Sequence, residues 1–190
     1  IYEMEHPDVL LWAVWALQQY AKETSREQCR QKYGELLEDI IGEAVQIMER
    51  RAARHDLHAE IPAALLMARM DARLMVQVLV NLLDNAVKYT PEGTAISVRA
   101  LADGQWVRLE VADNGPGISE QEQAGIFDMF HTAAVKKGDG RRGMGLGLAL
   151  CRSIVQAHGG QIEVHANLPQ GAVFSLALPR HDATQLLSDQ

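Results

Sequence analysis

The sequence predicts one α+β domain, because segments with helical periodicity are interspersed with pairs of short apolar strands. The helical segments are 35–54, 71–90 and 146–158. The strand pairs are 95–101 with 106–112 and 161–166 with 172–178, and a turn signal separates the members of each pair. The length of 190 residues and the hydrophobic content of 47% are sufficient for a single domain with a sizeable core.

The first 34 residues are expected to form a separate helical extension or linker. Leu10, Leu11, Val14 and Leu17 recur there at helical spacing. Apolar surface of this kind packs either on a partner or on the chain's own domain, and the sequence does not distinguish the two. The globular domain is expected over 35–180, with a tail at 181–190.

Local signals predict the order of the other elements. Asp71 is a suitable N-cap for the helix that begins there, and Pro91 ends that helix. Arginines near the end of the helix at 35–54 suit the negative end of its dipole. The remaining expected elements are short strands at 57–61 and 65–70, a short helix at 120–130 and a glycine-rich, basic loop at 131–144.

Composition excludes several classes of protein. Lys and Arg number 18 against 25 for Asp and Glu, which argues against the clustered basic surface of a nucleic-acid-binding protein. The longest apolar run, 9–17, is too short for a membrane span, which needs about 20 residues, and it lacks the features of a signal peptide. Cys29 and Cys151 fit no metal spacing, so we expect free thiols in a soluble, cytoplasmic chain.

Three stretches carry residues suited to a nucleotide. Asn81, Asn85 and Lys88 share one face of the helix at 71–90, and amide oxygens and an ammonium suit Mg²⁺ and phosphates. Asp113 lies where a strand meets a glycine loop, so its carboxylate could accept a hydrogen bond from an adenine amino group. Glycines at 143–147 open a helix whose N-terminus favours an anion. The alternatives are a solvated helix face for the first stretch and a plain turn for the second, and the glycine pattern alone is a weak signal.

Taken together and in order, these stretches resemble the four sequence boxes of sensor histidine kinases. Residues 81–89, NLLDNAVKY, resemble the N box, and residues 113–118, DNGPGI, resemble the G1 box. Residues 126–130, IFDMF, resemble the F box, and residues 143–149, GMGLGLA, resemble the G2 box. The closing stretch from Cys151 to Ala172 is also similar to the potassium-responsive Kdp-type sensor kinases.

The resemblance implies a two-layer α/β sandwich of the Bergerat type, shared with gyrase, the Hsp90 chaperones and MutL, with helices on one face of a mixed sheet. It implies that ATP and Mg²⁺ are bound, with Asn85 at the metal and Asn81 and Lys88 in catalytic positions. The residues that it assigns to nucleotide binding are Asn81, Asn85, Lys88, Tyr89, Asp113, Gly115, Gly117, Ile118, Phe127, Phe130, Gly143, Gly145, Leu146, Gly147 and Leu148. Glycines of the G1 box would let the backbone approach the adenine ring.

Two features set the expected reaction. The related ATPases resemble one another in having a Glu that activates water where this chain has Asn81, a poor general base, so ATP hydrolysis should be slow. No histidine matches the family's phosphoacceptor pattern, His-Glu/Asp-x-Arg/Lys-Thr-Pro. The resemblance therefore implies a histidine kinase catalytic domain that gives the γ-phosphate to a histidine outside this chain.

The implied partners are a dimerising helical domain that carries the acceptor histidine and a downstream response regulator. Residues 1–34 could be a remnant of that dimerising region. The fragment would be monomeric, the parent kinase homodimeric, and the chain the soluble part of an inner-membrane sensor. The alternative is a nucleotide-sensing module that binds ATP and acts only through protein contacts; the intact N, G1 and G2 boxes favour the kinase.

Overall fold

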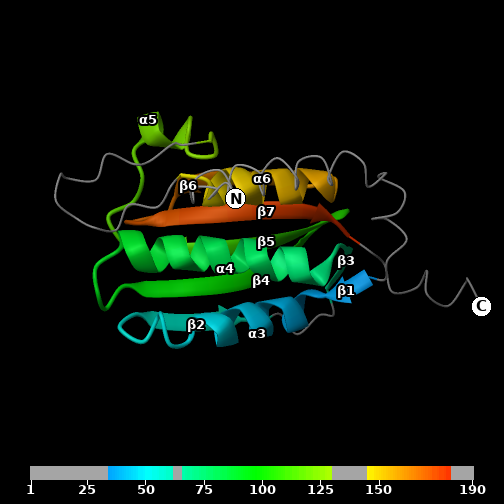
Figure 1. The fold of residues 1–190 in the computed structure, drawn as a ribbon, viewed down its shortest axis with the longest axis horizontal. Helices are drawn as coiled ribbons and strands as arrows, with labels where there is room; N and C mark the ends of the chain where they lie inside the picture. The colour runs from blue at the N-terminus through cyan, green and yellow to red at the C-terminus, as the bar shows by residue number, and fades with distance from the viewer. Residues whose placement is uncertain (1–33, 62–65, 130–144, 181–190) are drawn as a thin grey trace, which may run out of the picture.

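A computed structural model describes residues 34–61, 66–129 and 145–180 of the chain (Figure 1). The predicted N-terminal extension, the basic loop and the C-terminal tail lie outside these residues. The described elements are β1 (Gly34–Leu36), α3 (Leu37–Met48), β2 (Asp56–Glu60), β3 (Met67–Arg69), α4 (Ala72–Tyr89), β4 (Ala95–Asp103), β5 (Trp106–Asp113), α5 (Glu120–Gln123), α6 (Gly147–Ala157), β6 (Gln161–Ala166) and β7 (Ala172–Pro179).

The main sheet of the described residues has five strands in the order β2-β4-β5-β7-β6. Strand β2 runs parallel to β4, and the other neighbours are antiparallel. Strands β1 and β3 form a separate two-stranded pair. The mixed sheet with helices confirms the predicted α+β class.

Helices α3, α4 and α6 share one hydrophobic core with the sheet. Alternate strand residues face this core, as in Val98, Val111 and Phe174, which lie side by side on β4, β5 and β7. Helix α4 packs between α3 and α6, and it crosses in front of the sheet in Figure 1. The helices therefore cover one face, as expected for a two-layer sandwich.

The long helix α4 has the two faces that its sequence predicted. Its buried residues are Met75, Val76, Val78, Leu79, Leu82, Leu83 and Ala86. Asp71 caps the helix as predicted, since its Oδ1 accepts hydrogen bonds from the N–H groups of Arg73 at 3.0 Å and Leu74 at 3.2 Å. The capped helix holds its C-terminal turns, with Asn81 and Asn85, at one end of the sheet.

Two predicted helices are shorter in the structure. The helix expected at 35–54 is α3, residues 37–48, because Gly34–Leu36 pairs with β3 and residues 49–55 form turns that bring β2 alongside β4. The arginines near its expected end therefore lie in turns, beyond the helix. The helix expected at 120–130 is α5, residues 120–123, and residues 124–129 are turns and a bend.

The two hairpins and the last helix agree with the sequence prediction to within two residues at each end. The expected strands at 57–61 and 65–70 correspond to β2 and to the shorter β3. No helix among the described residues is long and apolar enough to cross a bilayer.

Candidate functional site

Three predicted stretches meet at one end of the molecule. Thr90 follows the last residue of α4 and packs against the loop after β5, because a Cβ built on Gly115 would lie 2.5 Å from its Cγ2. Asn114 of that loop accepts a hydrogen bond from the N–H of Ala95 at 2.8 Å, and its own N–H donates to the Ala95 carbonyl. Helix α6 packs on α4. The N-box helix, the G1 loop and the start of α6 thus lie together.

The polar face of α4 is partly buried and partly committed to ion pairs. Asn81 and Asn85 are half-buried, and Gln77 donates to the Asn81 Oδ1 at 3.4 Å. Lys88 forms an ion pair with Asp84 on the same helix, and Arg51 lies 3.5 Å from the other carboxylate oxygen of Asp84. The Lys88 ammonium is therefore paired with Asp84 in this structure.

Behind Asn81, helix α6 presents a buried thiol. Cys151 is fully buried, and its Sγ lies 3.8 Å from the Val78 carbonyl oxygen. Burial raises the pKa of Cys151 to about 12, and a hydrogen bond with the Asn81 side chain opposes that rise. Cys151 is unpaired, as the sequence predicted.

Asp113 ends β5 on the helix-facing side of the sheet, since it pairs in register with Ile96 and Ala172. The residue is buried, and its carboxylate accepts hydrogen bonds from the backbone N–H of Gly115, at 2.9 Å, and of Ala172. Burial raises the pKa of Asp113, and these two backbone hydrogen bonds oppose that rise. A buried carboxylate held by two donors still has lone pairs for a further amino group.

The glycines of this loop are required by contacts within the protein, a reason that differs from the expected approach of a ring. A Cβ on Gly115 would collide with Thr90 and with the Asp113 Oδ1 at 2.9 Å. Gly117 has a φ of +78°, and its Cβ would lie 3.0 Å from the carbonyl oxygen of Gly171. Both glycines therefore let neighbouring segments come together around Asp113.

Two residues beyond the predicted set lie beside Asp113 and the loop that follows it. Asn167, in the turn after β6, donates from Nδ2 to the main-chain oxygen of Asp113 at 2.8 Å. Thr90 is buried and donates from its hydroxyl to the Ala86 carbonyl at 2.7 Å. An Asn or Thr beside a turn is too common a signal to identify either from sequence, because the contacts of Asn167 with Asp113 and of Thr90 with Gly115 join segments distant in the chain.

Two further predicted residues, Ile118 of the G1 box and Phe127 of the F box, lie against the core. The Phe127 ring meets the Phe174 ring edge-on, with centroids 6.2 Å apart at 89°. This contact anchors the chain just before the residues outside the described part, which include Phe130 and Gly143.

The start of α6 is exposed at Gly147. Gly145 has a φ of +67°, and a Cβ on Gly147, the first residue of the helix, would meet nothing within 4 Å. The cap residue Leu146 makes no side-chain hydrogen bond, so the first N–H groups of α6 lack a side-chain cap. Leu146 is buried, and the predicted residue Leu148 packs against the core. Open N–H groups at a helix N-terminus suit a phosphate.

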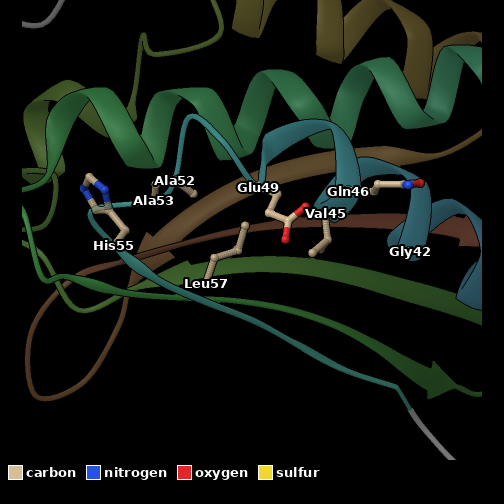
Figure 2. A pocket seen from close by; sticks show the side chains of 8 residues that line it. All are labelled: Gly42, Val45, Gln46, Glu49, Ala52, Ala53, His55 and Leu57. Atoms are coloured by element: carbon tan, nitrogen blue, oxygen red, sulfur yellow. The ribbon is translucent and has the colours of Figure 1, made fainter.

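A separate groove lies between α3 and β2. Figure 2 shows its lining: Gly42, Val45, Gln46, Glu49, Ala52, Ala53, His55 and Leu57. None of the predicted site residues lines this groove. Within the described residues no cluster of three or more His, Cys, Asp or Glu side chains could hold a metal ion.

Comparison with known proteins agrees with this geometry. Residues 70–182 match the family described as histidine kinase-, DNA gyrase B- and HSP90-like ATPases. The chain is 42% identical over 146 residues to the sensor protein KdpD of Clostridium acetobutylicum, covering 77% of this chain and 16% of KdpD. It is 41% identical over 146 residues to the adaptive-response sensory kinase SasA of Synechococcus sp., covering 75% of this chain and 38% of SasA. The chain thus spans well under half of either relative.

Among solved structures, the chain is similar to the catalytic domain of histidine kinase ThkA. The two share 30% sequence identity and superpose with a TM-score of 0.68, and the match covers 78% of this chain and 97% of that domain. This match covers nearly all of a domain that has been described as catalytic.

Proposed function

Because the chain belongs to the histidine kinase-, DNA gyrase B- and HSP90-like ATPase family, we propose that it binds Mg·ATP and gives the γ-phosphate to a histidine outside its own sequence. One observation carries the proposal: a buried carboxylate, a helix face with two carboxamides and an uncapped helix N-terminus lie at one end of the fold. These groups match the three parts of the ligand: base, metal with phosphates, and phosphate chain.

At the base, Asp113 accepts the adenine amino group. Its two backbone donors and its burial orient the carboxylate before the ligand arrives, so little ordering is needed on binding. The carboxylate accepts but does not donate while it is ionised, which favours a base with an amino group at this position. Gly117 and Ile118 follow Asp113 in the same loop.

At the phosphates, the open N-terminus of α6 supplies backbone donors through Gly145 and Gly147. Lys88 and Tyr89 lie at the end of α4, where both side chains are exposed. In this proposal the Lys88 side chain moves from Asp84 to the phosphates. Its positive charge there offsets the negative charge of the phosphate groups.

The residues present fit a magnesium ion. Within the described part of the chain the Asn85 side chain makes no hydrogen bond, so its amide oxygen is available as a hard ligand. The absence of an acidic cluster there implies that ATP itself supplies most of the oxygen ligands. When bound, Mg²⁺ would neutralise charge on the phosphates. Asn81 lies one helical turn away and cannot act as a strong general base.

The transfer needs a partner that carries the acceptor. His158 is unsuited to that role, because its Nε2 accepts from the Asp71 N–H at 2.9 Å and its Nδ1 lies 2.8 Å from the Ile154 carbonyl oxygen. We place the acceptor on a dimerising helical domain of the parent kinase, with a response regulator receiving the phosphate next. In this proposal residues 35–180 form the catalytic domain, and the parent is a homodimeric, Kdp-like sensor at the inner membrane.

Phosphotransfer tests the proposal directly. The chain is mixed with γ-labelled ATP and a separately purified acceptor-helix domain of the same polypeptide or operon. We expect acid-labile label on the acceptor histidine and slow release of free phosphate. Tight ATP binding without transfer to any acceptor would instead support the nucleotide-sensing module.

The metal assignment has its own test. Asn85→Ala should remove the Mg²⁺ dependence of ATP binding while leaving the unfolding transition unchanged. The matched control is Gln77→Ala, an exposed amide two turns earlier on α4. Equal Mg²⁺ dependence in Asn85→Ala and the parent would exclude Asn85 as a ligand.

A further inference from the structure

The turn between β6 and β7, residues 167–171, reaches the end of β5 where Asp113 lies. Ala166 of β6 pairs with Ala172 of β7, and Ala172 pairs in turn with Asp113 of β5. The turn that joins β6 to β7 therefore lies beside the proposed base pocket, although it is more than fifty residues away in sequence.

Two donors from this hairpin act on Asp113. Asn167 donates from Nδ2 to the Asp113 main-chain oxygen at 2.8 Å, and the N–H of Ala172 donates to the Asp113 carboxylate. Asn167 also closes the turn, because its own N–H donates to the Gly171 carbonyl at 3.0 Å. One asparagine thus links the shape of the turn to the position of Asp113.

The turn and the end of β5 are in direct contact at Gly171. A Cβ on Gly171 would lie 1.8 Å from the Asp113 carbonyl oxygen, and the residue has a φ of +121°. On the other side, Gly117 packs against the Gly171 carbonyl. A shift of the turn must therefore move Asp113 or the G1 loop.

We infer that Asn167 is a positioning residue that sets the base selectivity of the nucleotide site through the main chain of Asp113. The inference rests on the proposed function, in which the Asp113 carboxylate accepts the adenine amino group.

The loss of affinity on changing Asn167 should differ between ligands, because only the amino group of the base bonds to the Asp113 carboxylate. The hydrogen bonds from Gly115 and Ala172 fix the direction of the lone pairs that remain for the base. Loss of the Asn167 amide loosens the strand end and misaligns those lone pairs. A purine without the exocyclic amino group loses nothing by this misalignment, whereas adenine loses its directional hydrogen bond.

The test compares two ligands, ATP and purine riboside triphosphate, which lacks the amino group. Dissociation constants for both are measured by calorimetry for the parent, Asn167→Ala and Asn167→Asp. The control is Gln170→Ala, an exposed residue of the same turn. We expect Asn167→Ala to weaken ATP about threefold to tenfold, the worth of one hydrogen bond, with little change for the analogue. Asn167→Asp should weaken ATP binding further, because it places a second acceptor against the main-chain oxygen of Asp113.

The outcomes separate this inference from the function on which it rests. Equal loss for both ligands, or no loss for either, in the Asn167 variants would overturn the positioning role. Failure of the parent and of Asp113→Asn to differ in their preference for ATP would overturn the base assignment, and the inference with it. If Asn167→Ala does not fold, the ratio of the two constants in Asn167→Asp decides. Partial recovery of that ratio in Asn167→Gln, which keeps the donor, is expected.

Discussion

The contact between Gly115 and Thr90 joins the N-box helix to the G1 loop, and a single methyl group tests it. A Cβ on Gly115 would lie 2.5 Å from Thr90 Cγ2, about 1 Å inside the usual carbon–carbon separation. Thr90 cannot swing away, because it is buried and its hydroxyl is bonded to the Ala86 carbonyl. We expect Gly115→Ala to lower the free energy of unfolding by about 2 to 3 kcal/mol, as overpacking does.

The matched variant removes the methyl group of Thr90 that the added Cβ would meet. Thr90→Ser keeps the hydroxyl and deletes Cγ2, at a cost of about 1 kcal/mol. In that background the nearest remaining atoms to the added Cβ are the Asp113 Oδ1 at 2.9 Å and the Cβ of residue 90 at 3.0 Å. Gly115→Ala should then cost about half as much, so the two changes should couple by about 1 kcal/mol or more.

Urea denaturation of the parent, both single variants and the double variant measures this coupling. The slopes of the four transitions should agree, so that differences in midpoint report stability. Costs that add to within about 0.5 kcal/mol would refute the proposed contact. ATP affinity should fall in Gly115→Ala as well, because the added methyl group also displaces the Asp113 carboxylate.

Three further predictions concern buried groups. Burial raises the pKa of Asp113, so its contribution to stability is present below the ordinary aspartate pKa and is lost as pH rises through the raised value. In urea denaturation at several pH values, Asp113→Asn should match or exceed the parent near neutral pH and lose that advantage in acid, while ATP affinity drops. His158→Ala should lower the free energy of unfolding by about 1 to 3 kcal/mol and speed amide exchange at Asp71, whose N–H loses its acceptor; unchanged exchange would contradict this hydrogen bond. In a Cys29→Ser background, Cys151, with its pKa of about 12, should react with a thiol reagent only as the protein unfolds, and fast labelling of the folded chain would refute its burial.

The N-box helix shows how far local patterns determine the structure. Its cap at Asp71, its apolar face and the row of Asn81 and Asn85 all follow from residues a few positions apart. The same holds for both hairpins, each of which has two short apolar strands joined by a turn that carries a glycine. Such features depend on neighbouring residues, so the sequence itself specifies them.

The ends of α3 and α5 depend on tertiary contacts, which the hydrophobic periodicity of the sequence does not reveal. Helix α3 begins only after a strand that pairs with β3, and it ends at Met48, so that β2 can align with β4. The residues after Gln123 are held by the packing of Phe127 on Phe174 rather than by a continuing helix. Each outcome was decided by segments distant in the chain.

By itself the sequence determined the order of elements, the α+β class and the residues with chemistry suited to a nucleotide. Only the tertiary structure decided what holds the central carboxylate. Gly115, Asn167 and Ala172 converge on Asp113 from two segments, and Thr90 wedges against the same loop. Residue type and spacing specify local conformation, whereas a buried polar group needs partners that only the packing of distant segments can supply.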